Sequence, residues 1–222
     1  MATKQLKKYQ EKAVTKLLSR SKELFDENLD KRTIVFQAPT GSGKTFMMSK
    51  YIEELIELFE DEDLCFLWLS IGKGALHVQS YDSLKNEFQG FPECNLLEDE
   101  YFGSKKEIDK NEVVIANWEK LRTKDSKTGE WKNILMKDKE TVNFRELIHN
   151  TTQSGKTIIL IIDESHSNST SERAIELRDE IVNSDLTIEM SATPVLREGE
   201  YNEKVQVQSN DVIEEGIKRS NT

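Results

Sequence analysis

The sequence predicts an α/β fold in which a mostly parallel central sheet is covered by helices on both faces. Short apolar segments alternate with longer segments whose apolar residues recur at helical spacing. The predicted strands are nearly continuous apolar runs, which is typical of parallel sheets buried on both faces. The chain has 222 residues, enough for one domain with a sizeable core or at most two small ones.

A helix is predicted first, over residues 9–25, because apolar side chains recur there at helical spacing. A short apolar strand over residues 33–37 follows and runs directly into a glycine-rich turn. The next helix is predicted over residues 44–59, with acidic residues crowding its end. The apolar segment 64–70 is the next strand, and the segment 74–88 is the next helix.

The same alternation continues in the second half of the chain. Residues 113–116 are an apolar strand, and residues 143–150 are predicted to be helical. The most apolar strand follows at residues 157–162. A helix over residues 171–183 then leads to the last clear core strand, residues 186–190.

Two segments interrupt this alternation. Residues 120–139 are polar and rich in lysine, with Trp131 among them, and are interpreted as an insertion. Residues 211–222 are interpreted as a polar tail without a closing element. The simplest division is therefore one domain over residues 1–210, followed by the tail.

The composition narrows the class of protein. A net charge of −10 argues against a surface that is basic all over, although a local basic groove stays compatible with it. The longest apolar run is too short to cross a membrane, and the first residues lack the apolar core of a signal peptide. Cys65 and Cys94 lie far apart and match no metal-binding spacing. A reduced, cytoplasmic protein without membrane association is expected.

Residues 38–45, Ala-Pro-Thr-Gly-Ser-Gly-Lys-Thr, fit a loop that binds the phosphates of ATP, and we call them the phosphate loop. Its glycines let backbone N–H groups turn inward around an anion, and the following helix adds its N-terminal dipole. Lys44 is expected to reach the β- and γ-phosphates, and the Thr45 hydroxyl to ligate Mg²⁺. The expected ATP-binding residues of the loop are Pro39, Thr40, Gly41, Ser42, Gly43, Lys44 and Thr45.

The most apolar strand ends in Asp163-Glu164-Ser165-His166, and parallel sheets place their ligands outside such strand ends. Asp163 is therefore expected to hold Mg²⁺, and Glu164 to orient and deprotonate the attacking water. Two interpretations of His166 stay open: a sensor of the γ-phosphate or a satisfied surface residue. Lys44, Asp163, Glu164 and His166 are the predicted catalytic residues.

Ser191-Ala192-Thr193 ends the next strand, at the same edge of the predicted sheet. Hydroxyl groups there could hydrogen-bond His166 or Glu164 and couple the nucleotide state to the rest of the molecule. The alternative interpretation is a simple turn before Pro194.

Together these motifs resemble the first RecA-like lobe of superfamily 2 helicases and translocases. The phosphate loop corresponds to motif I, residues 163–166 to motif II in its DExH form, and residues 191–193 to motif III. Residues 6–10, Leu-Lys-Lys-Tyr-Gln, resemble the glutamine motif of these proteins. The resemblance implies one RecA-like P-loop NTPase domain, in which Gln10 reads the adenine edge and Tyr9 packs beside it.

Three further segments resemble the helicase subunit of type III restriction endonucleases. They are residues 66–81, 115–121 and 212–218. This likeness implies the ATP-binding lobe of a DNA-dependent ATPase that moves on duplex DNA, with further domains or a methyltransferase subunit as its partners. Such enzymes close the ATP site with arginines from a second RecA-like lobe, so this chain is expected to be one part of a longer protein. An arginine finger contributes roughly 10³–10⁵ in rate, so the isolated lobe is expected to hydrolyse ATP poorly.

The resemblance also implies contacts to the nucleic-acid backbone from loops beside the ATP site. The candidates are Lys73, Gln79, Asn117 and Lys120. The basic insertion at residues 120–139 offers charge and the Trp131 ring for stacking, but a solvated loop explains it slightly better.

Other classes of protein stay open. An RNA helicase lobe is the nearest, although Ser-Ile-Gly-Lys-Gly at residues 70–74 replaces the Pro-Thr-Arg-Glu sequence usual in DEAD-box enzymes. A nucleotide-binding regulatory module that does not hydrolyse ATP is a second alternative, opposed by the presence of Lys44 and Glu164. A small-molecule kinase would need a cluster of lid arginines, and Arg173 and Arg178 are too isolated to form one.

Overall fold

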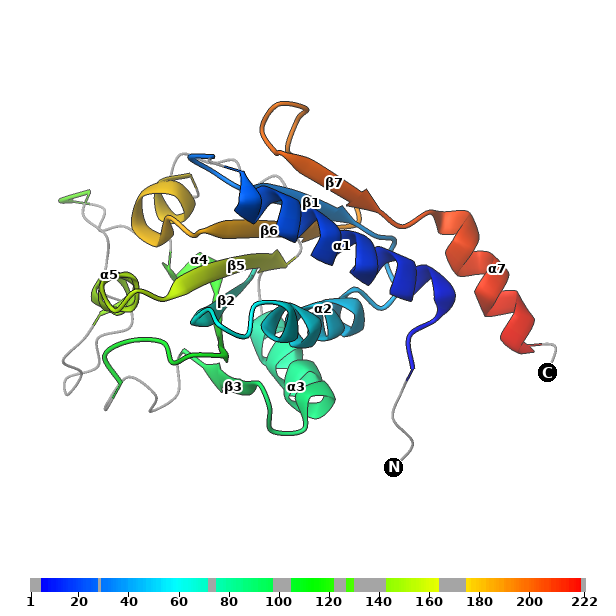
Figure 1. Cartoon of the computed structure of the whole chain (residues 1–222), viewed down its shortest axis with the longest axis horizontal. Helices are drawn as coiled ribbons and strands as arrows, with labels where there is room; N and C mark the ends of the chain where they lie inside the picture. The colour runs from blue at the N-terminus through cyan, green and yellow to red at the C-terminus, as the bar shows by residue number, and fades with distance from the viewer. Residues whose placement is uncertain are drawn as a thin grey trace.

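A parallel sheet of seven strands forms the centre of the computed structural model, in the order β3-β4-β2-β5-β6-β1-β7 (Figure 1). Every pairing between neighbouring described strands is parallel. The structure describes residues 5–27, 29–71, 75–97, 105–121, 127–129, 143–163 and 175–220, without the side chains of residues 119–120 and 216–220. The strands are β1 (Thr33–Gln37), β2 (Leu64–Ser70), β3 (Glu93–Leu96), β4 (Glu112–Asn117), β5 (Thr157–Asp163), β6 (Leu186–Ser191) and β7 (Glu203–Gln206).

Helices cover both faces of this sheet, as predicted. They are α1 (Lys8–Asp26), α2 (Lys44–Leu58), α3 (Leu76–Phe88), α4 (Trp118–Leu121), α5 (Phe144–Gln153) and the π-helix η3 (Glu176–Val182), and a further helix, α7 (Ser209–Ser220), follows β7. Successive side chains of a strand point to opposite faces, and β5 shows this clearly. Ile159 and Ile161 pack in the core under α1, α2 and α3, whereas Leu160 packs in the core under α4, α5 and η3. The predicted α/β fold is confirmed.

The central strands are apolar because both of their faces are covered. All seven residues of β2 are buried, and so are the five inner residues of β5. The two edge strands are different, since only Cys94 in β3 and Val205 in β7 are fully buried. Neither edge strand was predicted from the sequence. Within the described residues, no helix is both long enough and apolar enough to cross a membrane.

The C-terminal segment contains a helix that was not predicted from the sequence. Residues 211–222 were expected to be a tail without a closing element, but residues 209–220 form helix α7, which extends away from the sheet (Figure 1). Val212 packs partly against the core, whereas Ile213 is 56% exposed, so one face of the helix is anchored. Most of the predicted insertion at residues 120–139, including Trp131, lies outside the described residues.

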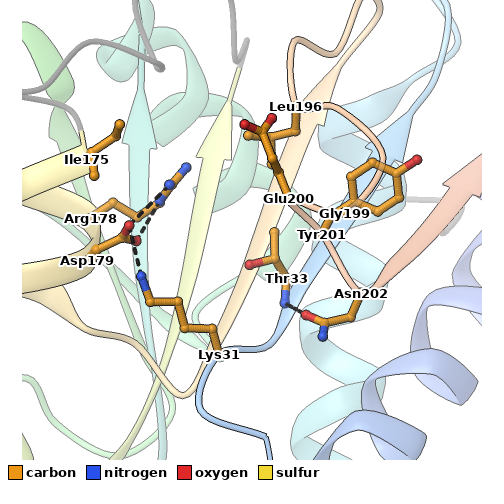
Figure 2. A pocket seen from close by; sticks show the side chains of 10 residues that line it. All are labelled: Lys31, Thr33, Ile175, Arg178, Asp179, Leu196, Gly199, Glu200, Tyr201 and Asn202. Atoms are coloured by element: carbon orange, nitrogen blue, oxygen red, sulfur yellow. Dashed lines mark hydrogen bonds and ion pairs between the residues drawn. The ribbon is translucent and has the colours of Figure 1, made fainter.

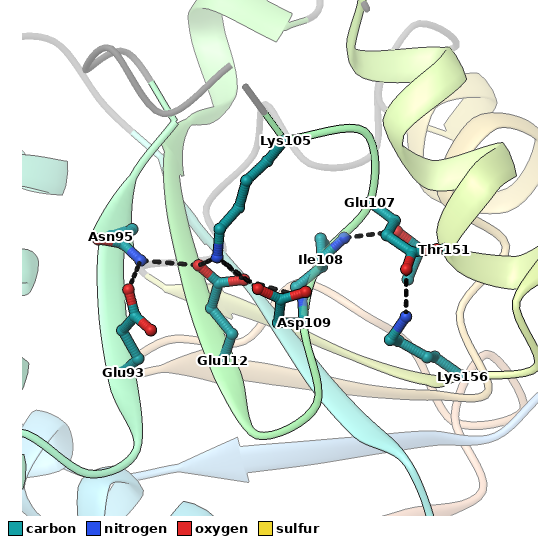
Figure 3. Close-up of polar contacts among 9 residues, drawn as sticks. All are labelled: Glu93, Asn95, Lys105, Glu107, Ile108, Asp109, Glu112, Thr151 and Lys156. Carbon is teal, nitrogen blue, oxygen red and sulfur yellow. Dashed lines mark hydrogen bonds and ion pairs between the residues drawn. The ribbon is translucent and has the colours of Figure 1, made fainter. Parts of the chain in front are cut away.

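A polar network joins the two strands at one edge of the sheet to the segment before β4 (Figure 3). At its centre is Glu112, which is 1% exposed. Its carboxylate accepts hydrogen bonds from Asn95 Nδ2 at 2.7 Å and from the Asp109 N–H at 2.8 Å. Lys105 Nζ lies 3.3 Å from Glu112 Oε1 and 2.6 Å from Asp109 Oδ2. The network therefore compensates a buried charge and holds β3, β4 and the intervening segment together.

Candidate functional site

The phosphate loop turns sharply between the end of β1 and the start of α2. Gly41 and Gly43 have φ values of +78° and +85°, a conformation that glycine adopts without strain. Gly43 is also the N-cap of α2, so the first N–H groups of that helix lie at the loop. Such groups, together with the helix dipole, favour bound anions.

Two side chains of α1 hydrogen-bond to the backbone of this loop. The Tyr9 hydroxyl and Gln10 Nε2 both donate to the Ser42 carbonyl oxygen, at 2.9 and 2.8 Å. Gln10 Oε1 accepts from the Lys7 N–H at 2.9 Å. A Cβ atom added to Gly43 would lie only 2.7 Å from Gln10 Nε2. We call Tyr9 and Gln10 the α1 clamp, because they fix the loop backbone directly.

Lys44 and Thr45 line a cavity of about 460 Å³ at the carboxyl ends of β2 and β5. That volume is within the range of small-molecule sites. Lys44 is 9% exposed, and its ammonium group lies 3.4 Å from the Ala38 carbonyl oxygen. The lining residues come from the phosphate loop and α2, from the ends of β2 and β5, and from α3. They are Thr40, Gly41, Gly43, Lys44, Thr45, Phe46, Ser70, Ile71, Leu76, Gln79, Ser80, Ser83, Glu87 and Asp163.

Asp163 ends β5 and lies in this cavity, level with Ser70 of β2. Its Oδ2 accepts a hydrogen bond from the Ser80 hydroxyl at 3.2 Å. The Ser80 and Ser70 hydroxyl oxygens are also 3.2 Å apart. A carboxylate, a threonine hydroxyl and a lysine ammonium group thus meet in one cavity beside a glycine-rich loop.

The chemistry of these groups fits a nucleotide phosphate with Mg²⁺. Magnesium prefers oxygen ligands, and proteins usually bind it through one or two side chains together with substrate phosphates. Thr45 and Asp163 are the oxygen donors that would hold it. Among the described residues, no cluster of three or more His, Cys, Asp and Glu side chains could hold a metal alone. Thr45 and Asp163 offer oxygen ligands of the kind that Mg²⁺ takes together with a substrate phosphate.

Comparison with known proteins identifies the family. The family model described as "Type III restriction enzyme, res subunit" matches residues 3–196. The chain belongs to this ResIII family. Among curated proteins, nothing matches it.

Solved structures support a RecA-like α/β fold for this ResIII chain. The Type ISP restriction-modification enzyme LlaBIII bound to DNA is 16% identical with a TM-score of 0.60, over 96% of this chain and 16% of that one. A nuclease-deletion mutant of the Type ISP enzyme LlaGI, in complex with a DNA substrate mimic, is 17% identical with a TM-score of 0.59, over 96% and 21%. The UvsW helicase from bacteriophage T4 is 15% identical with a TM-score of 0.50, over 93% and 62%. The chain thus spans less than two thirds of each of these proteins.

The predicted coupling segment of this ResIII chain lies against the phosphate loop. The Ser191 carbonyl oxygen accepts from the Ala38 N–H at 3.1 Å, and the Ala192 carbonyl oxygen accepts from Gln37 Nε2 at 3.2 Å. Ser191 Oγ accepts from the Thr193 N–H at 3.0 Å, which shapes the turn. The segment therefore contacts the first residue of the loop through its backbone. Its predicted partners Glu164 and His166 lie outside the described residues, so those two contacts stay predictions.

The predicted nucleic-acid residues do not form one exposed surface in the described part of the chain. Gln79 is exposed but lines the cavity with Lys44 and Asp163. Asn117 ends β4 and is only 5% exposed. Lys73 and the side chain of Lys120 lie outside the described residues. The contacts to nucleic acid therefore stay a prediction.

Helix α3 forms one wall of the cavity, and this wall was not predicted from the sequence. Leu76, Ser80, Ser83 and Glu87 recur at spacings of three and four residues, so they share one face of the helix. That face points into the cavity. The spacing was visible in the sequence, but a polar helix face is equally typical of solvent exposure.

A second cavity, of about 430 Å³, lies on the η3 side of β1 (Figure 2). In it Lys31 and Arg178 both point at the Asp179 carboxylate, at 3.0 and 2.8 Å. Arg178 also pairs with Glu189, a carboxylate that is 1% exposed, at 2.8 Å. These charges compensate one another, which indicates a structural role.

Proposed function

We propose that this helicase-type ATPase domain is the ATP-binding lobe of a DNA-dependent ATPase that moves on duplex DNA as part of a type III restriction-modification enzyme. The observation that carries the proposal is the meeting of Lys44, Thr45 and Asp163 in one cavity beside the phosphate loop. The ResIII family match and the helicase-like fold support the same class.

The roles of the residues follow from their chemistry. The N–H groups of the phosphate loop and the Lys44 ammonium group bind the phosphates, while Thr45 and Asp163 would hold Mg²⁺. When bound there, Mg²⁺ would supply positive charge that neutralises the negative charge developing on the phosphate during phosphoryl transfer. Glu164 orients the attacking water and accepts its proton, and residues 191–193 transmit the nucleotide state.

Duplex DNA is the proposed track. Two of the structural relatives are restriction enzymes solved with DNA or with a DNA mimic. Those relatives are much longer than this chain, which agrees with a second RecA-like lobe and a methyltransferase subunit as proposed partners.

Nucleotide binding is the first test. Titration of a fluorescent ATP analogue should give saturable, Mg²⁺-dependent binding that Lys44→Ala weakens strongly. Lys50→Ala is the matched control, because Lys50 lies on the same helix but pairs with Glu53. Equal binding by wild type and Lys44→Ala would contradict the proposed site.

Stimulation by nucleic acid is the second test. ATP hydrolysis would be measured with duplex DNA, single-stranded DNA or RNA, on this chain and on the chain joined to its second lobe, with Glu164→Gln as the inactive control. Stimulation by duplex DNA supports the proposal. Stimulation by RNA alone would favour an RNA helicase lobe, and binding without turnover in either form would favour a regulatory module.

A further inference from the structure

Helix α3 supplies a hydroxyl group to the carboxylate that is proposed to hold Mg²⁺. Ser80 lies on α3 and is 7% exposed, and its hydroxyl donates to Asp163 Oδ2 at 3.2 Å. The two residues are 83 positions apart in the chain, so the contact depends on the packing of α3 against the end of the sheet. Ser80 also lines the cavity itself.

The direction of hydrogen bonding around Ser80 can be assigned. A serine hydroxyl has one hydrogen to donate, and that of Ser80 is directed at Asp163. The Ser70 hydroxyl, 3.2 Å from Ser80 Oγ, must therefore be the donor in the second bond. Ser70 is 1% exposed. The two serines form a buried chain of donors, Ser70 to Ser80 to Asp163, which ends on the carboxylate.

Such a chain has two effects on a metal ligand. The bond to Oδ2 sets the rotation of the carboxylate plane, and each donor polarises the next in a low-dielectric surrounding. Groups that hydrogen-bond to a metal ligand and orient it contribute about 10–100-fold to metal affinity.

We propose that Ser80 is a positioning residue for Asp163, and that the Ser70–Ser80 chain raises the affinity of the nucleotide-bound site for a divalent cation. This inference rests on the proposed function, since it requires nucleotide and cation in the same cavity. Because the donor comes from α3, the helix that also carries Gln79, a displacement of α3 changes the orientation of the carboxylate.

The coupling between cation and nucleotide measures this effect without any turnover. The Kd of the chain for a fluorescent ATP analogue is measured in EDTA and at saturating Mg²⁺, and the ratio of the two values gives the coupling. In Ser80→Ala we expect an unchanged Kd in EDTA and a ratio about 10-fold smaller than in wild type. Ser80→Thr keeps the hydroxyl and should restore most of the ratio. Asn86→Ala, at an exposed position of α3 outside the cavity, should leave both values unchanged.

Ser70→Ala provides an independent variant if Ser80→Ala does not fold. It removes only the outer donor and should lower the ratio by a smaller factor. If Ser80→Ala folds and shows the wild-type ratio of Kd values, the inference is overturned. If Ser80→Ala does not fold, a wild-type ratio in Ser70→Ala overturns it instead. Either result leaves the proposed function standing. Absence of nucleotide binding by the wild-type chain in both conditions overturns the proposed function itself.

Discussion

Two separate features favour glycine at position 43: its backbone conformation and its contact with Gln10. Its φ of +85° favours glycine, and a Cβ atom there would lie 2.7 Å from Gln10 Nε2 in the α1 clamp. Gly155 has a similar φ of +81° but open space around the Cβ position. Comparison of Gly43 with Gly155 therefore distinguishes the effect of backbone strain from the effect of a steric contact.

We therefore predict that Gly43→Ala weakens ATP-analogue binding, because Gln10 Nε2 must shift from its present position at the Ser42 carbonyl oxygen. Gly155→Ala carries a similar backbone strain, of about 1–3 kcal/mol, but should bind the analogue normally. The measurements are urea denaturation and fluorescence titration on both variants. Normal binding by Gly43→Ala would show that the Gln10 contact to the loop is not needed for binding.

Asp179 gives a pH-dependent contribution to stability. Burial acts to raise its pKa, but hydrogen bonds from Arg178 and Lys31 outweigh burial and hold the pKa below the usual aspartate value. A carboxyl group with a lowered pKa stabilises the fold above its unfolded pKa, and this stabilisation is lost as the pH falls through the folded pKa.

Asp179→Asn should therefore be less stable than wild type at pH 7, and the difference should shrink as the pH falls below about 4. Urea denaturation at pH 7, 5 and 3 tests this. Asp82→Asn changes an exposed carboxylate on α3 and serves as control. A stability difference that is constant over this range would argue against the ion pairs as its source.

At the scale of elements, the network around Glu112 supports the edge formed by β3 and β4. Lys105→Met would remove the Lys105 ammonium group from the buried Glu112 carboxylate and leave its Asn95 and Asp109 donors in place (Figure 3). We expect a loss of about 2 kcal/mol in the free energy of unfolding. Lys110→Met breaks an exposed pair with Asp63 and should cost less than about 1 kcal/mol. Equal losses in urea denaturation would contradict a special role for the buried network.

The elements also show what the sequence could predict. The central strands were predictable because coverage on both faces requires continuous apolar runs, as in β2 and β5. The edge strands β3 and β7 were not, because each buries mainly one side chain and depends on a neighbour for its pairing.

The candidate site also has parts that were predictable from the sequence and parts that were not. The spacing of residues 38–45 and the apolar strand before Asp163 predicted where the cavity lies. The hydroxyl chain through Ser80 was not predictable, because its partner is 83 positions away and a serine on a helix carries no signal of that contact.

At the scale of the molecule, α7 extends from the sheet and is anchored mainly through Val212. A chain that ends at Gln208 should therefore keep its fold, with a melting temperature lowered by no more than about 4 °C. A chain that ends at Asn202 also loses β7, with buried Val205 and Val207, and should melt at least about 8 °C lower. Thermal denaturation of both truncations tests the predicted domain boundary at residue 210. Unfolding of the longer truncation would place α7 within the domain.

The order of strands has a consequence for the chain during its synthesis. The ribosome makes β1 early, yet among the described strands β1 pairs with β6 and β7, and the Thr33 N–H donates to Asn202 across 169 positions. Ala38, at the start of the phosphate loop, is held by Ser191. A nascent chain that has not reached β6 therefore exposes the phosphate loop without the strand that supports it. Nucleotide binding must follow translation of nearly all of the sheet, and until then β1 is an unpaired apolar strand that favours contact with chaperones.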